Sequence, residues 1–220
     1  MTHSSTLHDT RVESAINLMF AQAEHDEATA RRVRAQRPGG FVTMTPREHA
    51  DAAAQLYLPI SAEGGQLLYS LVRATRPATV IEFGTSFGIS TLYLAAAVRD
   101  NGTGRVISTE LSQAKITAAR RTFAEVGLED LITVLEGDAL ETLEGLDSSV
   151  NFVLLDGWKD LCLPVLRLLE RRIAAGTLVV ADDVDLTDLQ PYLSYVRDPA
   201  NGYQSVTFAV GEGMEISCRL

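Results

Sequence analysis

Three carboxylates and one lysine are the residues best placed for chemistry in the second half of this 220-residue chain. Asp156 closes the apolar run VNFVLLD and Lys159 follows it, while Asp182 and Asp183 close the run TLVVADD. Neighbouring parallel strands end at the same edge of a sheet, so these side chains would meet there. Crowded carboxylates repel one another unless a cation lies between them, and oxygen ligands suit Mg²⁺. The pattern predicts a divalent-metal site beside Lys159; alternatively, the acids cap the next segment and the lysine is exposed.

The segment VIEFGTSFGIS, residues 80–90, is typical of a ligand-binding turn between a strand and a helix. Gly84 and Gly88 let the backbone approach a ligand closely, and Ser90 opens a helix whose N-terminus offers free N–H groups. The spacing G-x-x-x-G departs from the nicotinamide fingerprint G-x-G-x-x-G. Glu82 would repel a pyrophosphate but attract an ammonium group, such as that of S-adenosylmethionine. A plain glycine turn is the alternative.

Two further acids follow the next two apolar runs. Glu110 ends RVISTE, where a carboxylate can accept hydrogen bonds from both hydroxyls of an adenosine ribose. Asp138, in LEGDAL, is expected near the adenine. Either acid alone is equally compatible with a solvated strand end or turn, so the inference depends on their combination with the glycine segment.

The elements that must position these residues alternate along the chain after residue 78. Short apolar runs alternate with amphipathic helical stretches, which predicts a doubly wound α/β fold with a mostly parallel sheet. The expected strands are TVIEF (79–83), RVIST (105–109), LITVL (131–135), VNFVLLD (150–156) and TLVVAD (177–182). The expected helices include 90–100, 112–127, with Ser112 as N-cap, and 162–176, preceded by two helices within 46–76. The tail, YQSVTFAV–GEG–MEISCRL, predicts an antiparallel C-terminal hairpin and about seven strands in all.

Composition limits the partners. The chain has 29 acids against 19 bases, a net charge of −10, which disfavours binding to nucleic acid or to anionic membranes. All four histidines precede residue 50, so the predicted strands cannot supply a serine–histidine–aspartate triad or a histidine-rich zinc site. Two cysteines without metal-type spacing, and an N-terminal sequence unlike a signal peptide, favour a cytoplasmic protein.

Taken together, the sequence resembles the catechol O-methyltransferase-like family of metal-dependent, S-adenosylmethionine-dependent methyltransferases. The resemblance covers roughly residues 58–220 and rests on EFGTSFGIS, Glu110, DGWKDLCLP, ADD and the closing YQS…EGME pattern. It implies a Rossmann-like methyltransferase domain over residues 51–220, preceded by an N-terminal helical cap over residues 1–50. It also implies a seven-stranded sheet with a reversed last strand, and a homodimer.

The resemblance assigns roles to individual residues. Lys159 would be the base that takes the proton from the substrate hydroxyl. Asp156, Asp182 and Asp183 would hold Mg²⁺, or Mn²⁺ or Ca²⁺. The cofactor pocket would comprise Glu82, Gly84, Ser86, Gly88, Ser90, Glu110, Leu111, Asp138, Ala139, Asp156 and Trp158. The expected reaction moves a methyl group from S-adenosylmethionine to a hydroxyl of a catechol-like or other vicinal-diol small molecule, and a phenol is the expected acceptor.

Several positions depart from the family pattern. Asp183 stands where the family usually has asparagine, and no acid occurs between Tyr203 and Val210, where animal catechol enzymes carry a glutamate. The first 50 residues match no family motif. Candidates for the substrate mouth are Phe41, Met44, Tyr57 and Leu58, although apolar residues in a capping region are more often core.

Three other functions stay open at this stage. One is a metal-independent S-adenosylmethionine-dependent methyltransferase that acts on another small molecule. Another is a non-catalytic module that only binds the cofactor. A nicotinamide-dependent reductase is disfavoured by the missing third glycine and by Glu82.

Overall fold

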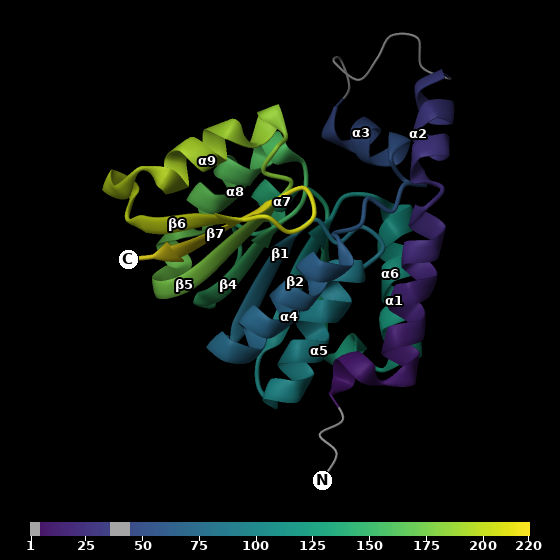
Figure 1. Ribbon diagram of the computed structural model, residues 1–220, viewed down its shortest axis with the longest axis horizontal. Coiled ribbons are helices and arrows are strands. Elements are labelled where there is room, and N and C mark those ends of the chain that lie inside the picture. Colours follow the sequence, from purple (N-terminus) through teal and green to yellow (C-terminus); the bar gives the residue numbers. More distant parts are fainter. Residues whose placement is uncertain (1–4, 36–44) are drawn as a thin grey trace.

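A seven-stranded sheet forms the centre of the protein, with the order β3-β2-β1-β4-β5-β7-β6 (Figure 1). The computed structural model describes residues 5–35 and 45–220. Strands β1 to β5 pair in parallel, and β7 runs antiparallel to both β5 and β6. The strands are β1 (Thr79–Phe83), β2 (Arg105–Glu110), β3 (Ile132–Glu136), β4 (Val150–Leu155), β5 (Ile173–Asp182), β6 (Tyr203–Phe208) and β7 (Met214–Arg219). The predicted doubly wound, mostly parallel sheet with an antiparallel end is confirmed.

Helices cover both faces of this sheet (Figure 1). They are α1 (Thr10–Ala23), α2 (Asp26–Ala35), α3 (Pro46–Ala52), α4 (Ala62–Thr75), α5 (Ile89–Asn101), α6 (Gln113–Val126), α7 (Ala139–Thr142), α8 (Cys162–Leu169) and α9 (Gln190–Arg197). Six 3₁₀ turns connect them in the described residues: Thr6–His8, Glu129–Leu131, Lys159–Leu161, Glu170–Arg172, Thr187–Leu189 and Pro199–Asn201. None of the helices in residues 5–35 and 45–220 has the length and apolar character to cross a bilayer.

Two buried clusters hold these layers together, one on each face of the sheet. Alternate strand residues point to opposite faces, so Val80 belongs to the cluster that includes α1, α4, α5 and α6, while Ile81 belongs to the cluster that includes α7, α8 and α9. The central helix α5 is buried on nearly every side, including Leu92 and Leu94 at 0% exposure. A core of this kind fixes the strand ends rigidly, which is what a site at the sheet edge requires.

Helix α1 belongs to the main helical layer. Its Val12, Ile16 and Met19 are buried in the same cluster as α4, α5 and α6. The side chain of Asp100 in α5 accepts hydrogen bonds from the backbone and hydroxyl of Thr6 and fastens the segment before α1. The predicted boundary at residue 50 falls inside α3, and α1 shares its core with the predicted methyltransferase domain.

One predicted element ends early. The helix expected over 162–176 stops at Leu169, and β5 begins at Ile173 rather than at residue 177. Ile173 pairs with Val150, and the register then shifts before Leu178 pairs with Phe152. The intervening residues 174–176 are exposed and Gly176 has φ +86°. Pairing with β4 therefore overrides the helical preference of the alanine-rich sequence.

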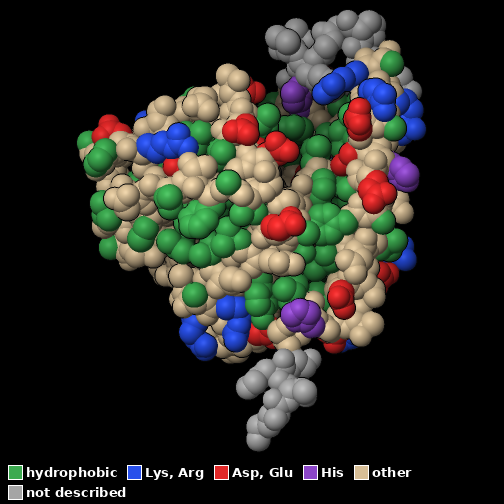
Figure 2. Space-filling view, in the orientation of Figure 1, with side chains coloured by type: hydrophobic (Ala, Val, Ile, Leu, Met, Phe, Trp, Pro, Cys, Tyr) green, Lys and Arg blue, Asp and Glu red, His purple; other side chains and the backbone are tan. Residues whose placement is uncertain are grey.

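The edge strand β6 carries apolar side chains on the surface (Figure 2). Val206 and Phe208 are 53% and 42% exposed, and they lie on the same face because side chains alternate along a strand. Their partner β7 is buried from Met214 to Ile216. The hairpin thus extends the sheet beyond β5, and β6 exposes these two apolar side chains at its edge.

Candidate active site

A cavity of about 270 Å³ lies at the carboxyl ends of the parallel strands. Its walls come from the loops after β1, β2, β3, β4 and β5, and from α3 and the segment before α4. Eleven predicted site residues line it: Gly84, Ser86, Ser90, Glu110, Leu111, Asp138, Ala139, Asp156, Trp158, Lys159 and Asp183. Three do not: Glu82, Gly88 and Asp182. A single cavity thus joins the segment predicted to bind the cofactor to the segment predicted to bind metal.

The turn after β1 needs its unusual backbone. Gly84 has φ +102°, and a Cβ there would lie 2.8 Å from the carbonyl oxygen of Asp156. Ser86 has φ +48° without being glycine. Its N–H donates to Oε2 of Glu110 at 2.8 Å, and its hydroxyl donates to the carbonyl of Tyr57 at 2.7 Å. These bonds offset the cost of the left-handed conformation and tie the turn to both neighbouring segments.

Glu110 is held by backbone groups. Its Oε1 accepts from the N–H groups of Leu111 at 2.9 Å and Ser112 at 2.8 Å, and Oε2 accepts from Ser86. Three amide donors fix the carboxylate at the cavity wall and leave acceptor capacity on Oε2 for a ligand. Ser112 precedes α6 as predicted, but its hydroxyl makes no capping bond.

Glu82 lies behind the cavity wall. It is completely buried, and its carboxylate accepts hydrogen bonds from the hydroxyls of Ser90, at 2.6 Å, Thr91 and Ser108. Burial raises its pKa to about 7, against the lowering effect of the three hydroxyls. Glu82 itself does not line the cavity, whereas Ser90, which donates to it, does; the predicted contact of Glu82 with a ligand ammonium stays a prediction.

Gly88 also serves packing. It has φ +95°, and a Cβ there would lie 2.5 Å from the ring of Phe123 in α6. Asp138, by contrast, lines the cavity and caps α7, accepting from the N–H of Leu140 at 2.8 Å. Asp138 is thus a turn aspartate that also lines the cavity, while its expected place near an adenine stays a prediction.

The predicted acid cluster forms. Oxygens of Asp156, Asp182 and Asp183 lie within 4.8 Å of one another. Lys159 bridges two of them, with Nζ 2.9 Å from Oδ1 of Asp156 and 3.0 Å from Oδ2 of Asp183. Burial, reinforced by the charges of Asp156 and Asp183, raises the pKa of Asp182 to about 7. One lysine is therefore not enough to relieve the repulsion.

Lys159 is an ammonium in this arrangement. Burial acts against its charge, but the carboxylates of Asp156 and Asp183 outweigh that effect and hold its pKa above the usual range. For Asp156 the effect of burial has the opposite sign: it raises the pKa of the carboxyl group, and the positive charge of Lys159 partly offsets that rise.

Trp158 lines the cavity next to the acid cluster. Its ring lies edge-on to His49 of α3, with 5.4 Å between ring centroids. This contact places α3 against the loop after β4 and narrows the cavity mouth from that side.

The mouth also includes residues that sequence reasoning only partly identified. Tyr57 and Leu58 line the cavity, as expected, whereas Phe41 and Met44 lie outside the described residues. The carboxylate of Asp26, at the start of α2, accepts from the N–H groups of Tyr57 at 3.0 Å and Leu58 at 2.7 Å. This clamp holds Leu58 at φ +47°. No sequence pattern near Asp26 indicated it.

Backbone strain concentrates around the cavity. Four described residues other than glycine have positive φ, and three of them, Leu58, Ser86 and Asp183, line the cavity. Such conformations cost about 1–3 kcal/mol each and tend to occur at functional sites. The distribution marks this cavity as the site independently of the motifs.

Comparison with known proteins agrees with the geometry. Residues 81–184 match a family described as a methyltransferase domain. The relatives that the chain resembles are O-methyltransferases of the catechol O-methyltransferase-like class. A probable O-methyltransferase of Mycobacterium tuberculosis is 33% identical over 153 residues, which is 64% of each chain. Catechol O-methyltransferase B of Danio rerio is 31% identical over 156 residues, 68% of this chain and 58% of its own.

Both alignments span less than two thirds of the relative's length. A solved O-methyltransferase of Bacillus cereus, in complex with S-adenosylhomocysteine, superposes with a TM-score of 0.67. That superposition covers 92% of this chain and 100% of the other at 20% identity, so it supports the fold alone. The predicted Rossmann-like methyltransferase fold is confirmed, and the similarity to O-methyltransferases agrees with the predicted family.

Proposed function

We propose that this protein transfers a methyl group from S-adenosylmethionine to a hydroxyl of a catechol-like small molecule, with a divalent cation at the acid cluster. The observation that carries the proposal is the continuity of the cavity from Ser86 and Glu110 to Asp156, Lys159 and Asp183. Two reactants bound at its two ends would meet between them, and fixed proximity supplies much of the acceleration in such transfers.

The cofactor end has the groups that a nucleoside needs. The carboxylate of Glu110, oriented by three amides, can accept from ribose hydroxyls. Asp138, Leu111 and Ala139 line the same end. The solved Bacillus cereus O-methyltransferase that shares this fold is in complex with S-adenosylhomocysteine, and we extend that ligand class to this chain as part of the proposal.

The acid cluster fits a hard dication. It offers three carboxylates within 4.8 Å of one another. The pKa of Asp182 is raised mainly by burial and in addition by the charges of Asp156 and Asp183, and a cation would offset both effects. Asp156, Asp182 and Asp183 would hold the ion. When bound, such an ion fixes the acceptor hydroxyls and lowers their pKa.

Lys159 would handle the proton. Its Nζ adjoins Asp156 and Asp183 and lines the cavity, so it can hold a proton taken from an acceptor hydroxyl. In this structure the two carboxylates keep it charged. A role as base therefore requires their negative charge to be shared with a cation, which couples proton transfer to occupancy of the acid cluster.

The acceptor end favours a flat, apolar molecule. Apolar side chains make up much of the same cavity wall, among them Pro46, Ala50, Leu58, Trp158 and Leu186. A phenolic ring fits such walls, while its hydroxyls reach the acids. The expected homodimer stays a prediction that sedimentation velocity can test.

The test is methyl transfer to a panel of catechols, with and without EDTA. We expect turnover to be abolished by EDTA, restored by Mg²⁺ or Mn²⁺, and reduced at least about 100-fold in Lys159→Ala and Asp156→Asn. Asp160→Asn is the matched control, because Asp160 is exposed beside the same loop. Near-normal turnover in both site variants, together with insensitivity to EDTA, contradicts the proposal.

A metal-independent methyltransferase is the second candidate. The ion pairs of Lys159 with Asp156 and Asp183 favour it, because a cation already neutralises part of the cluster. The same assay separates the two candidates: turnover that persists in EDTA but is lost in Lys159→Ala supports the metal-independent reaction.

A further inference from the structure

The chain contains only two lysines, Lys115 and Lys159, among 19 basic residues. All other basic residues are arginines, yet both lysines are buried and both line the active-site cavity. Lys159 belongs to the acid cluster. Lys115, in the first turn of α6, has no role in the function proposed above.

Lys115 is a buried charge with unused hydrogen-bonding capacity. It is 5% exposed, and its ammonium carries three donors. One hydrogen bond is found for it among the described residues, to the hydroxyl oxygen of Ser86 at 3.0 Å. A buried ammonium with unpaired donors is unfavourable, so the cavity side of Nζ is where a ligand oxygen would stabilise it.

The surroundings of Lys115 place it at the nucleoside end of the cavity. Ser86 donates its N–H to Glu110 and accepts from Lys115 through its hydroxyl, so both charged groups adjoin one residue. The ring of Phe87, stacked on Tyr57, has its centroid 5.7 Å from Nζ. Burial lowers the pKa of Lys115, while Glu110 and, farther away, Asp26 act to raise it.

Glu110 and Lys115 thus offer a ligand an acceptor and a donor from adjacent positions. A hydroxyl group can use both at once, because it donates through its hydrogen and accepts through its oxygen. An ether or a methylene cannot make the same pair of bonds. The arrangement is therefore selective for a hydroxylated sugar.

We propose that Lys115 is a specificity-determining residue of the nucleoside subsite, donating a hydrogen bond to a ribose hydroxyl of the cofactor that Glu110 also contacts. This inference rests on the proposed function, because it takes the ligand to be an adenosyl compound. The competing explanation is that Lys115 acts only through Ser86, by fixing the turn after β1.

The test uses calorimetric titration of the purified protein with S-adenosylhomocysteine and with its 2′-deoxy and 3′-deoxy analogues. We expect Lys115→Met to weaken binding of the parent compound about 10- to 100-fold. We also expect it to reduce the preference for the parent over at least one deoxy analogue by about tenfold or more, because the lost hydroxyl and the lost ammonium are partners. Arg121→Met, on the exposed face of α6, should change neither quantity.

The competing explanation gives a different result. If Lys115 only supports Ser86, then Ser86→Ala reproduces the loss, and Lys115→Met weakens all three compounds by the same factor. That outcome, or unchanged binding in Lys115→Met, overturns the inference while leaving the proposed function intact. Failure of the wild-type protein to bind S-adenosylhomocysteine overturns both.

A spectroscopic readout avoids dependence on affinity. With two lysines in the chain, a spectrum of ¹⁵N-labelled lysine side chains has two signals to assign, and Lys115→Met identifies one. S-adenosylhomocysteine should shift the Lys115 signal strongly, and the analogue that lacks the contacted hydroxyl should shift it less. Identical shifts with all three compounds contradict the proposed contact.

Discussion

The Nζ of Lys159 lies 3.0 Å from Oδ2 of Asp183, so a lysine from the loop after β4 neutralises an acid from the loop after β5. The same ammonium is 2.9 Å from Oδ1 of Asp156. Any divalent cation that binds the acid cluster must therefore share these two carboxylates with Lys159. Cation binding and the charge of Lys159 are thus opposed, and this opposition can be measured.

Replacing Lys159 with methionine should make the fold depend on divalent cations. The change leaves Asp156 and Asp183 without their buried partner, which destabilises the metal-free protein by about 3 kcal/mol. Mg²⁺ should then raise the melting temperature more in Lys159→Met than in the wild type, although methyl transfer is lost. The control is Arg171→Met, an equal change of charge at an exposed position. Equal Mg²⁺ shifts in all three proteins would show that no cation binds there.

Asp183→Asn tests a position at which this chain departs from the family pattern that it resembles. Asp183 has φ +60°, a conformation that asparagine also tolerates, so the variant should fold normally. It removes one negative charge from the cluster, and we expect Mn²⁺ affinity to fall at least about tenfold. Titration followed by electron paramagnetic resonance measures this directly. The nearby exposed Asp185 supplies the control, Asp185→Asn, and an equal loss there would mean that general charge, not coordination, sets the affinity.

The sequence allowed most of the sheet to be predicted because hydrophobic runs and glycine turns are local signals. The run TVIEF matches β1 residue for residue. By contrast, the start of β5 depends on the pairing of Ile173 with Val150, and these residues lie far apart in the sequence. A pattern read along one segment contains no information about that register.

The same distinction applies to the site. Asp156, Asp182 and Asp183 were predictable because strand ends of a parallel sheet converge. Lys115 and the Asp26 clamp were not, since each acts on a segment distant in sequence. The composition did contain a signal: the chain has only two lysines, and a residue type that rare can be examined position by position for a functional role.

Glu82→Gln should alter the pH dependence of stability. The pKa of Glu82 is raised from 4.5 to about 7, so between these values the folded protein holds a proton that the unfolded chain releases. The free energy of unfolding therefore falls as pH rises through this window, by up to about 3 kcal/mol. Glutamine cannot titrate, so the variant should show a flatter curve of melting temperature from pH 5 to 7.5. Parallel curves for the two proteins would mean that Glu82 is ionised throughout.

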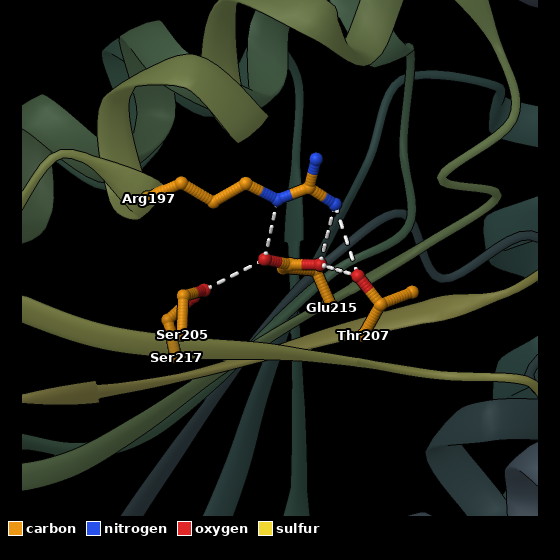
Figure 3. A network of polar contacts seen from close by, with 5 residues as sticks. All are labelled: Arg197, Ser205, Thr207, Glu215 and Ser217. Atoms are coloured by element: carbon orange, nitrogen blue, oxygen red, sulfur yellow. Dashed lines mark hydrogen bonds and ion pairs between the residues drawn. The ribbon is translucent and has the colours of Figure 1, made fainter.

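The closing hairpin is fastened by a buried carboxylate, shown in Figure 3. Glu215 of β7 is 1% exposed, and Arg197 of α9 donates to both of its oxygens at 2.8 Å. Ser205 and Thr207 of β6 donate to the same carboxylate. Burial acts to raise the pKa of Glu215, but these bonds outweigh it and hold the pKa below its usual range. Next to Glu215, Met214 pairs with Asp182, so the network supports the strand that ends in the acid cluster.

Arg197→Met should therefore weaken the fold. It leaves the charge of Glu215 buried with only hydroxyl donors, which we expect to destabilise the protein by about 2 kcal/mol at neutral pH. Because the native pKa of Glu215 is lowered, its contribution is present at neutral pH and is lost as pH falls through the carboxyl range, so the two proteins should converge in stability in acid. Thermal denaturation between pH 4 and 7 tests this, with Arg171→Met as the exposed control. A constant difference across that range would assign the loss to packing of the arginine chain rather than to the charge of Glu215.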